Sequence, residues 1–197
     1  MAGVRVSASL AVIGAIVAEF LASSGTATGL AGSSWKAARS SISRNSHGGQ
    51  PQVMDIVARD LRARHGMLVV CTSSYSLGHS DDLFPPEERR HGIHGGSGET
   101  SEMLALRPDL VRMDQARNFA SVQMEKDYEY LMPEGRVGFG WQTQDLNLAG
   151  ACGNALDADA ERGRLALDRA AAGLATLLGE VHRFPMAALR QRWGTPA

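Results

Sequence analysis

Cysteine is scarce in this chain, with only two residues, Cys71 and Cys152. They lie far apart in the sequence, and their spacing matches no metal-binding pattern. Two such thiols cannot build the disulfide framework of a small secreted domain. The scarcity of cysteine therefore favours a reducing compartment, and we expect a cytoplasmic protein.

An excess of charge is also lacking, because 20 Lys and Arg residues face 21 Asp and Glu residues. A strongly basic balance, which would indicate nucleic acid or an acidic membrane surface as a partner, is therefore excluded. No nucleic-acid-binding motif is present either. We expect a small molecule as the substrate, or another protein as a partner, and no nucleic acid.

The sequence has no apolar run long enough to span a membrane. The best candidate, Leu10–Leu21, is interrupted by Glu19. Its apolar residues recur at helical spacing, at Leu10, Ile13, Val17, Phe20 and Leu21. This pattern favours an amphipathic helix over residues 9–25 rather than a secretory signal, and we expect no membrane association. The polar residues that follow, as far as Arg44, predict a loop or a disordered segment.

The stretch after residue 50 has the pattern of a helix followed by a buried strand. Pro51 marks the first turn of the helix and Gly66 its end. One apolar face is predicted from Val53, Ile56, Val57 and Leu61. The continuous apolar run Met67–Cys71 then predicts a strand buried on both faces. A helix and a buried strand in this order form half of a parallel α/β unit.

The second half of the chain contains a long loop and two helices. Residues 72–98 have little periodicity, and we expect a surface loop whose charged patch Glu87–Arg90 is a solvated rim. A helix is predicted over Thr100–Leu106. A long amphipathic helix is predicted over Asp157–Val181, with an inward face made by Leu165, Leu174, Leu177, Leu178 and Val181.

Glycine is abundant, at 22 residues, against an average usage of about 7%. Much of the excess falls in two loops that contain histidine. The first, Asn45–Gln50, contains His47, and the second, His91–Ser101, contains His94 and Glu99. Imidazole and carboxylate groups on such a backbone can approach an ion or a polarised water closely.

Three motifs together resemble the creatininase (creatinine amidohydrolase) family. The first is Asn-x-His-Gly-Gly at residues 45–49, followed by a helix and an apolar strand that ends at Ser74-Tyr75-Ser76. The second is His-Gly-Gly-x-x-Glu-Thr-Ser at residues 94–101, and the third is Gly-Ala-Cys-Gly at residues 150–153. The resemblance implies a mainly parallel, three-layer α/β/α fold with an incomplete N-terminal part. It also implies a homo-oligomer, usually a hexamer, with two divalent ions such as zinc or manganese.

The resemblance also implies roles for individual residues. His47 would be a metal ligand, and Glu99 a ligand or its close neighbour. His94 would be the catalytic residue that handles protons or substrate. Substrate contacts are expected from Gly48, Gly49, Tyr75 and Gly95. The family-like domain would cover residues 45–185, between an atypical N-terminal segment, 1–44, and a tail, 186–197.

The chain departs from the family at its beginning. Family members start with a strand and a Thr-Glu-Gln-His-Gly loop, followed by an Asp, which supply further metal ligands, and no such segment is found here. Ser40–Arg44 also stands where the family has a buried strand. Two hypotheses follow. The chain is a metal-dependent amidohydrolase that cleaves an amide, even a cyclic one, in a small molecule, or it is a truncated or frame-shifted, non-catalytic remnant with at most a weak metal site.

Overall fold

The computed structural model describes residues 40–47, 49–77, 82–122, 128–134 and 137–189. The predicted helix over residues 9–25 lies outside this part of the chain, as does Gly48. The domain boundaries at residues 45 and 185 stay predictions. In the described part, no helix is long and apolar enough to cross a membrane.

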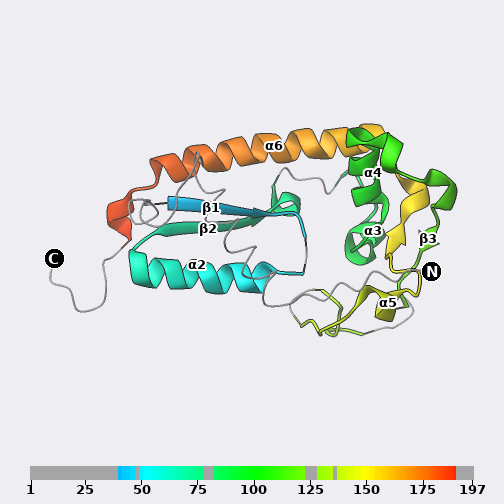
Figure 1. Ribbon diagram of the computed structural model, residues 1–197, viewed down its shortest axis with the longest axis horizontal. Helices are drawn as coiled ribbons and strands as arrows, with labels where there is room; N and C mark the ends of the chain where they lie inside the picture. The colour runs from blue at the N-terminus through cyan, green and yellow to red at the C-terminus, as the bar shows by residue number, and fades with distance from the viewer. Residues whose placement is uncertain (1–39, 48, 78–81, 123–127, 135–136, 190–197) are drawn as a thin grey trace. The chain divides into compact units, whose positions relative to one another are not determined.

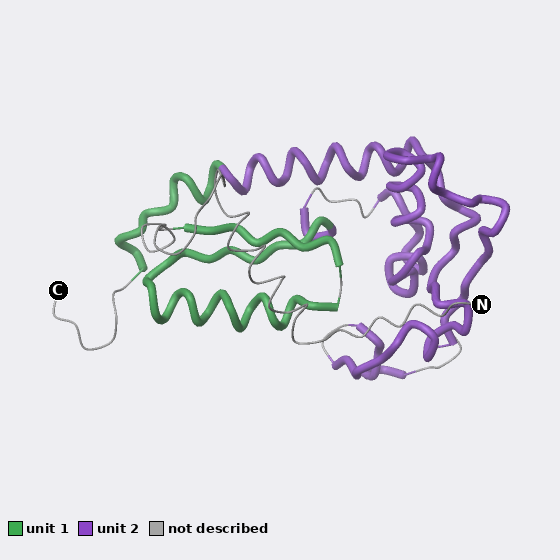
Figure 2. Tube along the Cα trace, in the orientation of Figure 1, with its two compact units in different colours: residues 1–74, 179–197 green, residues 75–178 purple. Residues whose placement is uncertain are grey.

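The chain divides into two compact units (Figure 2). Unit 1 comprises residues 1–74 and 179–197, and unit 2 comprises residues 75–178. The long helix α6 (Ala160–Arg183) belongs mostly to unit 2, and its last five residues belong to unit 1.

Unit 1 contains a parallel pair of strands joined by a helix (Figure 1). Strand β1 (Ser40–Asn45) pairs with β2 (Leu68–Ser73) along its whole length, from Ser40 opposite Leu68 to Asn45 opposite Ser73. Helix α2 (Pro51–His65) forms the connection. The mixed helix and parallel sheet confirm the predicted α/β class. The short 3-10 helix η7 (Met186–Ala188) also belongs to this unit.

The loop prediction was wrong for Ser40–Arg44, which form most of β1. This segment is rich in serine and has no apolar run, so local propensity gives little signal for a strand. The parallel backbone partners that β2 supplies override that weak propensity. The strand that the family has before its Asn-x-His-Gly-Gly loop is therefore present.

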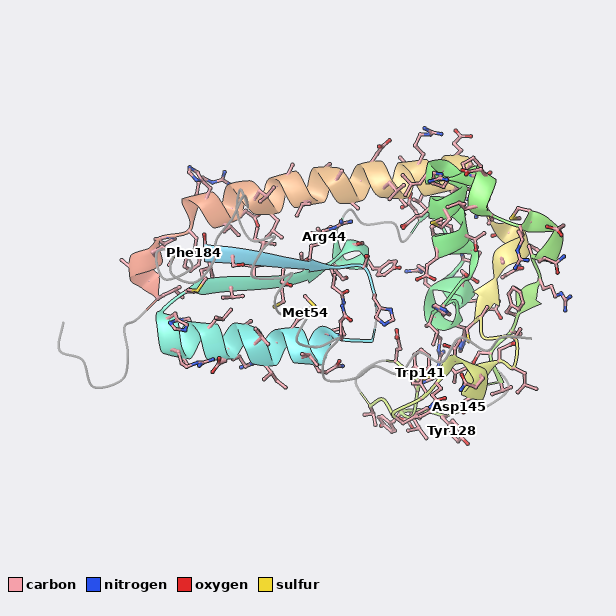
Figure 3. The ribbon with its side chains drawn as sticks, in the orientation of Figure 1. Arg44, Met54, Tyr128, Trp141, Asp145 and Phe184 are labelled. Atoms are coloured by element: carbon pink, nitrogen blue, oxygen red, sulfur yellow. The ribbon has the colours of Figure 1, made fainter. Side chains whose placement is uncertain are left out.

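Helix α2 begins and ends as predicted. Pro51 occupies its first turn, and Gly66 follows its last residue with φ 68°, donating its N–H to the carbonyl of Arg62. The helix packs against β2 through a stripe at helical spacing that consists of Met54, Val57, Ala58 and Leu61. Figure 3 shows Met54 on the side of the helix that faces the strands.

Two details of this helix and strand differ from the prediction. Val53 and Ile56, expected on the inward face, are 39% and 67% exposed, because the face toward β2 is centred one residue further along, on Ala58 and Leu61. Strand β2 is half-buried and Cys71 is exposed. The expected burial on both faces is therefore not observed, and among the described strands β2 pairs only with β1.

Unit 2 consists of short elements followed by most of α6. The 3-10 helix η2 (Ser74–Ser76) lies at its boundary with unit 1. The described elements are α3 (Pro86–His91), α4 (Ser97–Leu106), η3 (Pro108–Leu110), η4 (Met113–Gln115), β3 (Asn118–Phe119), α5 (Thr143–Leu146), β4 (Gly153–Asn154), η6 (Ala155–Asp157) and α6. Strands β3 and β4 form a short antiparallel pair.

The element boundaries in unit 2 correct the sequence prediction at several points. The predicted loop over residues 72–98 contains α3, and α4 begins at Ser97 rather than Thr100. Helix α6 confirms the long helix, shifted toward the C-terminus, but Leu165 and Leu178 are 41% and 53% exposed instead of inward-facing. Gly163 and Ala166 are the buried residues of α6, since small residues there allow a close approach to α4.

The core of unit 2 contains several small side chains. Ser97, Ser101, Leu146 and Cys152 are completely buried. Helices α4 and α6 approach each other so closely that a Cβ at Gly163 would collide with the backbone of Ser101. The N–H of Asp159, just before α6, donates to Ser101 Oγ at 2.8 Å. These contacts fix the start of α6 against α4.

Candidate functional site

His47 stands just past the carboxyl end of β1, in the position where open α/β sheets place their ligands. Its backbone is held by the side chain of Asn45, which is only 6% exposed. Asn45 Oδ1 accepts the N–H of His47 at 2.9 Å, and Asn45 Nδ2 donates to the His47 carbonyl. Gln50 Nε2 donates to the same Oδ1 at 3.1 Å. The exposed imidazole of His47 is thus carried by a fixed backbone.

Gly49 leaves the space that the His47 imidazole uses. A Cβ at Gly49 would lie 2.7 Å from His47 Nε2, closer than two such atoms approach. Any larger residue at position 49 would therefore displace the ring. The side-chain clamp of Asn45 and the open space at Gly49 explain three residues of the Asn-x-His-Gly-Gly motif, namely Asn45, His47 and Gly49.

Four of the predicted site residues come together in unit 2, around Glu99. The phenol of Tyr75 donates to Glu99 Oε1 at 2.9 Å, and the N–H of Gly95 donates to Glu99 Oε2 at 2.6 Å. The imidazole of His94 lies beside the same carboxylate, with Nδ1 3.9 Å from Oε2. His47 and Gly49 belong to unit 1.

The environment of Tyr75 keeps its phenol protonated. Burial raises the pKa of Tyr75, and the carboxylates of Glu99, Glu102 and Glu134 raise it further. Because a protonated phenol donates a hydrogen bond and cannot act as a base at neutral pH, Tyr75 is a donor in this site. Its side chain is 54% exposed, so a small molecule can reach it.

The backbone of His94 is paired with Cys152 on a neighbouring segment. The His94 N–H donates to the Cys152 carbonyl at 3.2 Å, and the Cys152 N–H donates to the His94 carbonyl at 2.6 Å. Gly95 follows with φ 67°, which reverses the chain toward α4. Burial raises the pKa of the Cys152 thiol, which opposes thiolate formation and fits a structural role. The Gly-Ala-Cys-Gly motif thus supports the His94 loop from behind.

Glu88 is the residue of this region that sequence reasoning missed. It was expected in a solvated rim, but its side chain is partly buried and accepts hydrogen bonds from the N–H groups of Ser97 at 2.5 Å and Asn154 at 2.8 Å. The sequence predicted a loop for residues 86–91, which form helix α3 instead. In this helix the side chain of Glu88 points in a different direction from those of its charged neighbours. The glycines at 92, 96 and 153, which leave room for the carboxylate, are a sequence signal only once the fold is known.

The described residues do not form a metal centre by themselves. In the ranges that the structure describes, no group of three or more His, Cys, Asp or Glu side chains could hold an ion. Zinc sites take three or four protein ligands. His47, His94 and Glu99 have the correct ligand chemistry; His94 and Glu99 lie side by side in unit 2, and His47 belongs to unit 1.

A profile of the protein family described as Creatininase: Creatinine amidohydrolase matches residues 27–178. The match begins well before Asn45, where the motif-based resemblance starts. A comparison with curated proteins returned no significant match.

Solved structures with related descriptions are similar to the chain. A putative creatinine amidohydrolase from Bacteroides fragilis NCTC 9343 has a TM-score of 0.59 and 22% identity, over 73% of this chain and 54% of its own. A mutant creatininase of the Zn-Zn type has a TM-score of 0.51 and 25% identity, over 73% and 57%. A structure described as Creatininase Mn has a TM-score of 0.51 and 24% identity, over 71% and 55%.

These likenesses confirm the predicted creatininase-like, three-layer α/β/α fold. The chain spans little more than half the length of the structures that it resembles.

Proposed function

Because the chain belongs to the creatininase family, we propose that it is a metal-dependent amidohydrolase that cleaves the C–N bond of a linear or cyclic amide in a small molecule. The family supports the amidohydrolase class. The observation that carries the proposal is the convergence of Tyr75, His94 and Gly95 on the carboxylate of Glu99. An imidazole beside a carboxylate, with a protonated phenol on the other oxygen, combines a proton carrier with a hydrogen-bond donor.

His94 is the proposed catalytic residue. Its half-exposed side chain lies next to Glu99, with Nδ1 3.9 Å from Oε2 of the carboxylate. A histidine in this position can take a proton from the attacking water and deliver it to the leaving amine. Glu99 also fixes Gly95, the residue after His94, and thereby limits the movement of the imidazole.

Substrate contacts are proposed for Tyr75, Gly48, Gly49 and Gly95. The phenol of Tyr75 is accessible and keeps its proton, so it can donate to a carbonyl or carboxylate of the substrate. The glycines have no side chain, which lets a small molecule approach the backbone closely.

The proposed cofactor is a divalent ion, zinc or manganese, with His47 and Glu99 as protein ligands. Two similar structures, a mutant creatininase of the Zn-Zn type and Creatininase Mn, support this choice by their names. A bound ion would supply water that deprotonates near neutral pH and would polarise the amide carbonyl. We also propose that the protein is cytoplasmic and forms a homo-oligomer, which would be a hexamer as the family resemblance implies.

A second candidate is a family member without turnover and with at most a weak metal site. The observation that favours it is the lack, among the described residues, of three ligand side chains close together. Two ligands hold zinc weakly, because structural and catalytic zinc sites use three or more.

The two candidates are separated by a hydrolysis assay on the full chain. Purified protein is offered zinc or manganese and a panel of small cyclic and linear amides, and release of the amine or carboxylate product is followed. We expect turnover of at least one amide, with a loss of about 100-fold or more in His94→Ala. His182→Ala is the matched control, because His182 is exposed near the end of α6. No turnover of any amide with either metal would favour the second candidate.

A further inference from the structure

Glu88 makes three backbone hydrogen bonds around the loop that carries His94. Its main-chain carbonyl accepts the N–H of Gly92 at 2.6 Å, where α3 ends. Its Oε1 accepts the N–H of Ser97 at 2.5 Å, where α4 begins. Glu88 therefore bonds to the first residue of the five-residue segment 92–96 and to Ser97, the residue that follows it; the central residue of this segment is His94.

The second carboxylate oxygen joins this loop to the strand behind it. Glu88 Oε2 accepts the N–H of Asn154 in β4 at 2.8 Å. Asn154 lies two residues after Cys152, whose backbone pairs with that of His94 in both directions. The same carboxylate thus bridges the two segments whose pairing sets the position of His94.

The space around the carboxylate is shaped by glycine. A Cβ at Gly92 or at Gly96 would collide with the Glu88 side chain, and a Cβ at Gly153 would lie 2.7 Å from Oε1. Gly153 also has φ 132°, which a residue with a side chain rarely adopts. Three glycines from two segments accommodate one carboxylate, which indicates a built position rather than a surface contact.

The negative charge of the Glu88 carboxylate is also favourable where it lies, beside the first residue of α4. Gly96, the N-cap residue of this ten-residue helix, has no side chain to cap the first N–H groups. A carboxylate on the Ser97 N–H supplies that missing acceptor and interacts favourably with the positive end of the helix dipole. Glu99, the neighbour of His94, lies in the same first turn.

We infer that Glu88 is a positioning residue for His94: its carboxylate clamps the His94 loop between α3, α4 and β4 and so holds the imidazole next to Glu99. Its effect on turnover rests on the proposed function, whereas its effect on the loop does not. The carboxylate matters, because its two oxygens accept one N–H group each, whereas the amide of glutamine has a single acceptor oxygen.

The test compares Glu88→Gln with Glu87→Gln in the full chain. Both remove one negative charge from α3, but Glu87 is exposed and no glycine cradle surrounds it. In Glu88→Gln the amide nitrogen cannot accept, so one of the two backbone N–H groups loses its partner. We expect amide hydrogen exchange of Ser97 or Asn154 to become about tenfold faster or more, and the imidazole NMR signals of His94 to shift. Neither change is expected in Glu87→Gln.

Turnover distinguishes a positioning residue from a merely structural one, because loss of a merely structural residue would not lower kcat selectively. For any amide that the wild type hydrolyses, Glu88→Gln is expected to lower kcat about tenfold or more with little change in KM, and Glu88→Asp, which keeps the carboxylate, to recover part of the loss. Circular dichroism checks that each variant is folded. If Glu88→Gln is unfolded, Glu88→Asp with its shorter carboxylate carries the exchange and NMR comparison in its place.

The outcomes separate the two proposals. A wild type without turnover contradicts the proposed function, while exchange and the His94 signals still test the clamp. Exchange rates and His94 signals that are the same in the folded Glu88 and Glu87 variants overturn the clamp, whatever the activity.

Discussion

The side-chain amide of Asn45 holds the backbone of His47 from both sides, accepting its N–H at 2.9 Å and donating to its carbonyl oxygen. The pair lies at the end of β1, and Asn45 is almost completely buried. The carboxamide combines an acceptor oxygen and a donor nitrogen, and exchange of Asn45 for the isosteric acid therefore loses the donor.

Asn45→Asp is expected to destabilise the protein by about 1–3 kcal/mol, because the new oxygen faces the His47 carbonyl and leaves it without a donor. The free energy of unfolding in urea measures the effect. Asn118→Asp is the matched control, since Asn118 is exposed in the short strand β3 and the change in charge is the same. Equal effects of the two substitutions would contradict the role given to Asn45.

The pair of Tyr75 and Glu99 predicts a pH dependence at high pH. The pKa of Tyr75 lies above the ordinary value of 10.0, because of burial and the nearby carboxylates, Glu99 first. A raised folded-state pKa means that the neutral phenol's contribution to stability is complete below pH 10 and is lost as the pH rises through the higher folded value. Tyr75→Phe is expected to cost about 1 kcal/mol at neutral pH and to remove this high-pH component.

Phenolate absorbance during a pH titration checks that prediction. The difference between wild type and Tyr75→Phe isolates the Tyr75 transition, which we expect above pH 10 in the folded protein and near pH 10 in urea. A folded-state transition at or below pH 10 would show that the Tyr75–Glu99 bond does not form in solution.

Two helical glycines predict opposite effects of alanine. Gly163→Ala places a methyl group against the backbone of Ser101 in α4, and overpacking of this kind costs about 1–3 kcal/mol. Gly98, in α4, has no atom within 4 Å of a built Cβ, so Gly98→Ala is expected to be neutral or to stabilise by up to about 1 kcal/mol. Thermal unfolding of the two variants measures both, and a Gly163→Ala protein as stable as Gly98→Ala would mean that α4 and α6 pack less closely than described.

The sequence predicted the parts of the fold that have local signals. Pro51 marks the start of α2 because proline restricts the backbone there, and Gly66 marks its end because glycine permits a positive φ. The apolar run after Gly66 marks β2. Strand β1 escaped prediction because half of its residues are serine and its stability comes from pairing with β2. The start of α4 was misplaced because the acceptor for its first N–H is Glu88, nine residues earlier, rather than a local capping residue.

The candidate site shows the same division. His47, His94 and Glu99 were found from motifs whose residue types suit the chemistry, and the link between Tyr75 and Glu99 depends on a fold that brings together residues 24 positions apart. Glu88 could not be recognised, because a glutamate among Glu and Arg neighbours has the pattern of a solvated face. Its partners at Ser97 and Asn154 are backbone N–H groups, which almost every residue type has, so the sequence does not indicate them.

Metal content of the purified full chain tests the central claim most directly. Zinc or manganese is offered, excess ion is removed, and bound metal is counted by mass spectrometry in wild type, His47→Ala, Glu99→Ala and the control His182→Ala. The account predicts bound metal in wild type and control, and a marked loss of it in both His47→Ala and Glu99→Ala. Wild-type protein that retains no more metal than His47→Ala would contradict a metal-dependent amidohydrolase built on these two ligands.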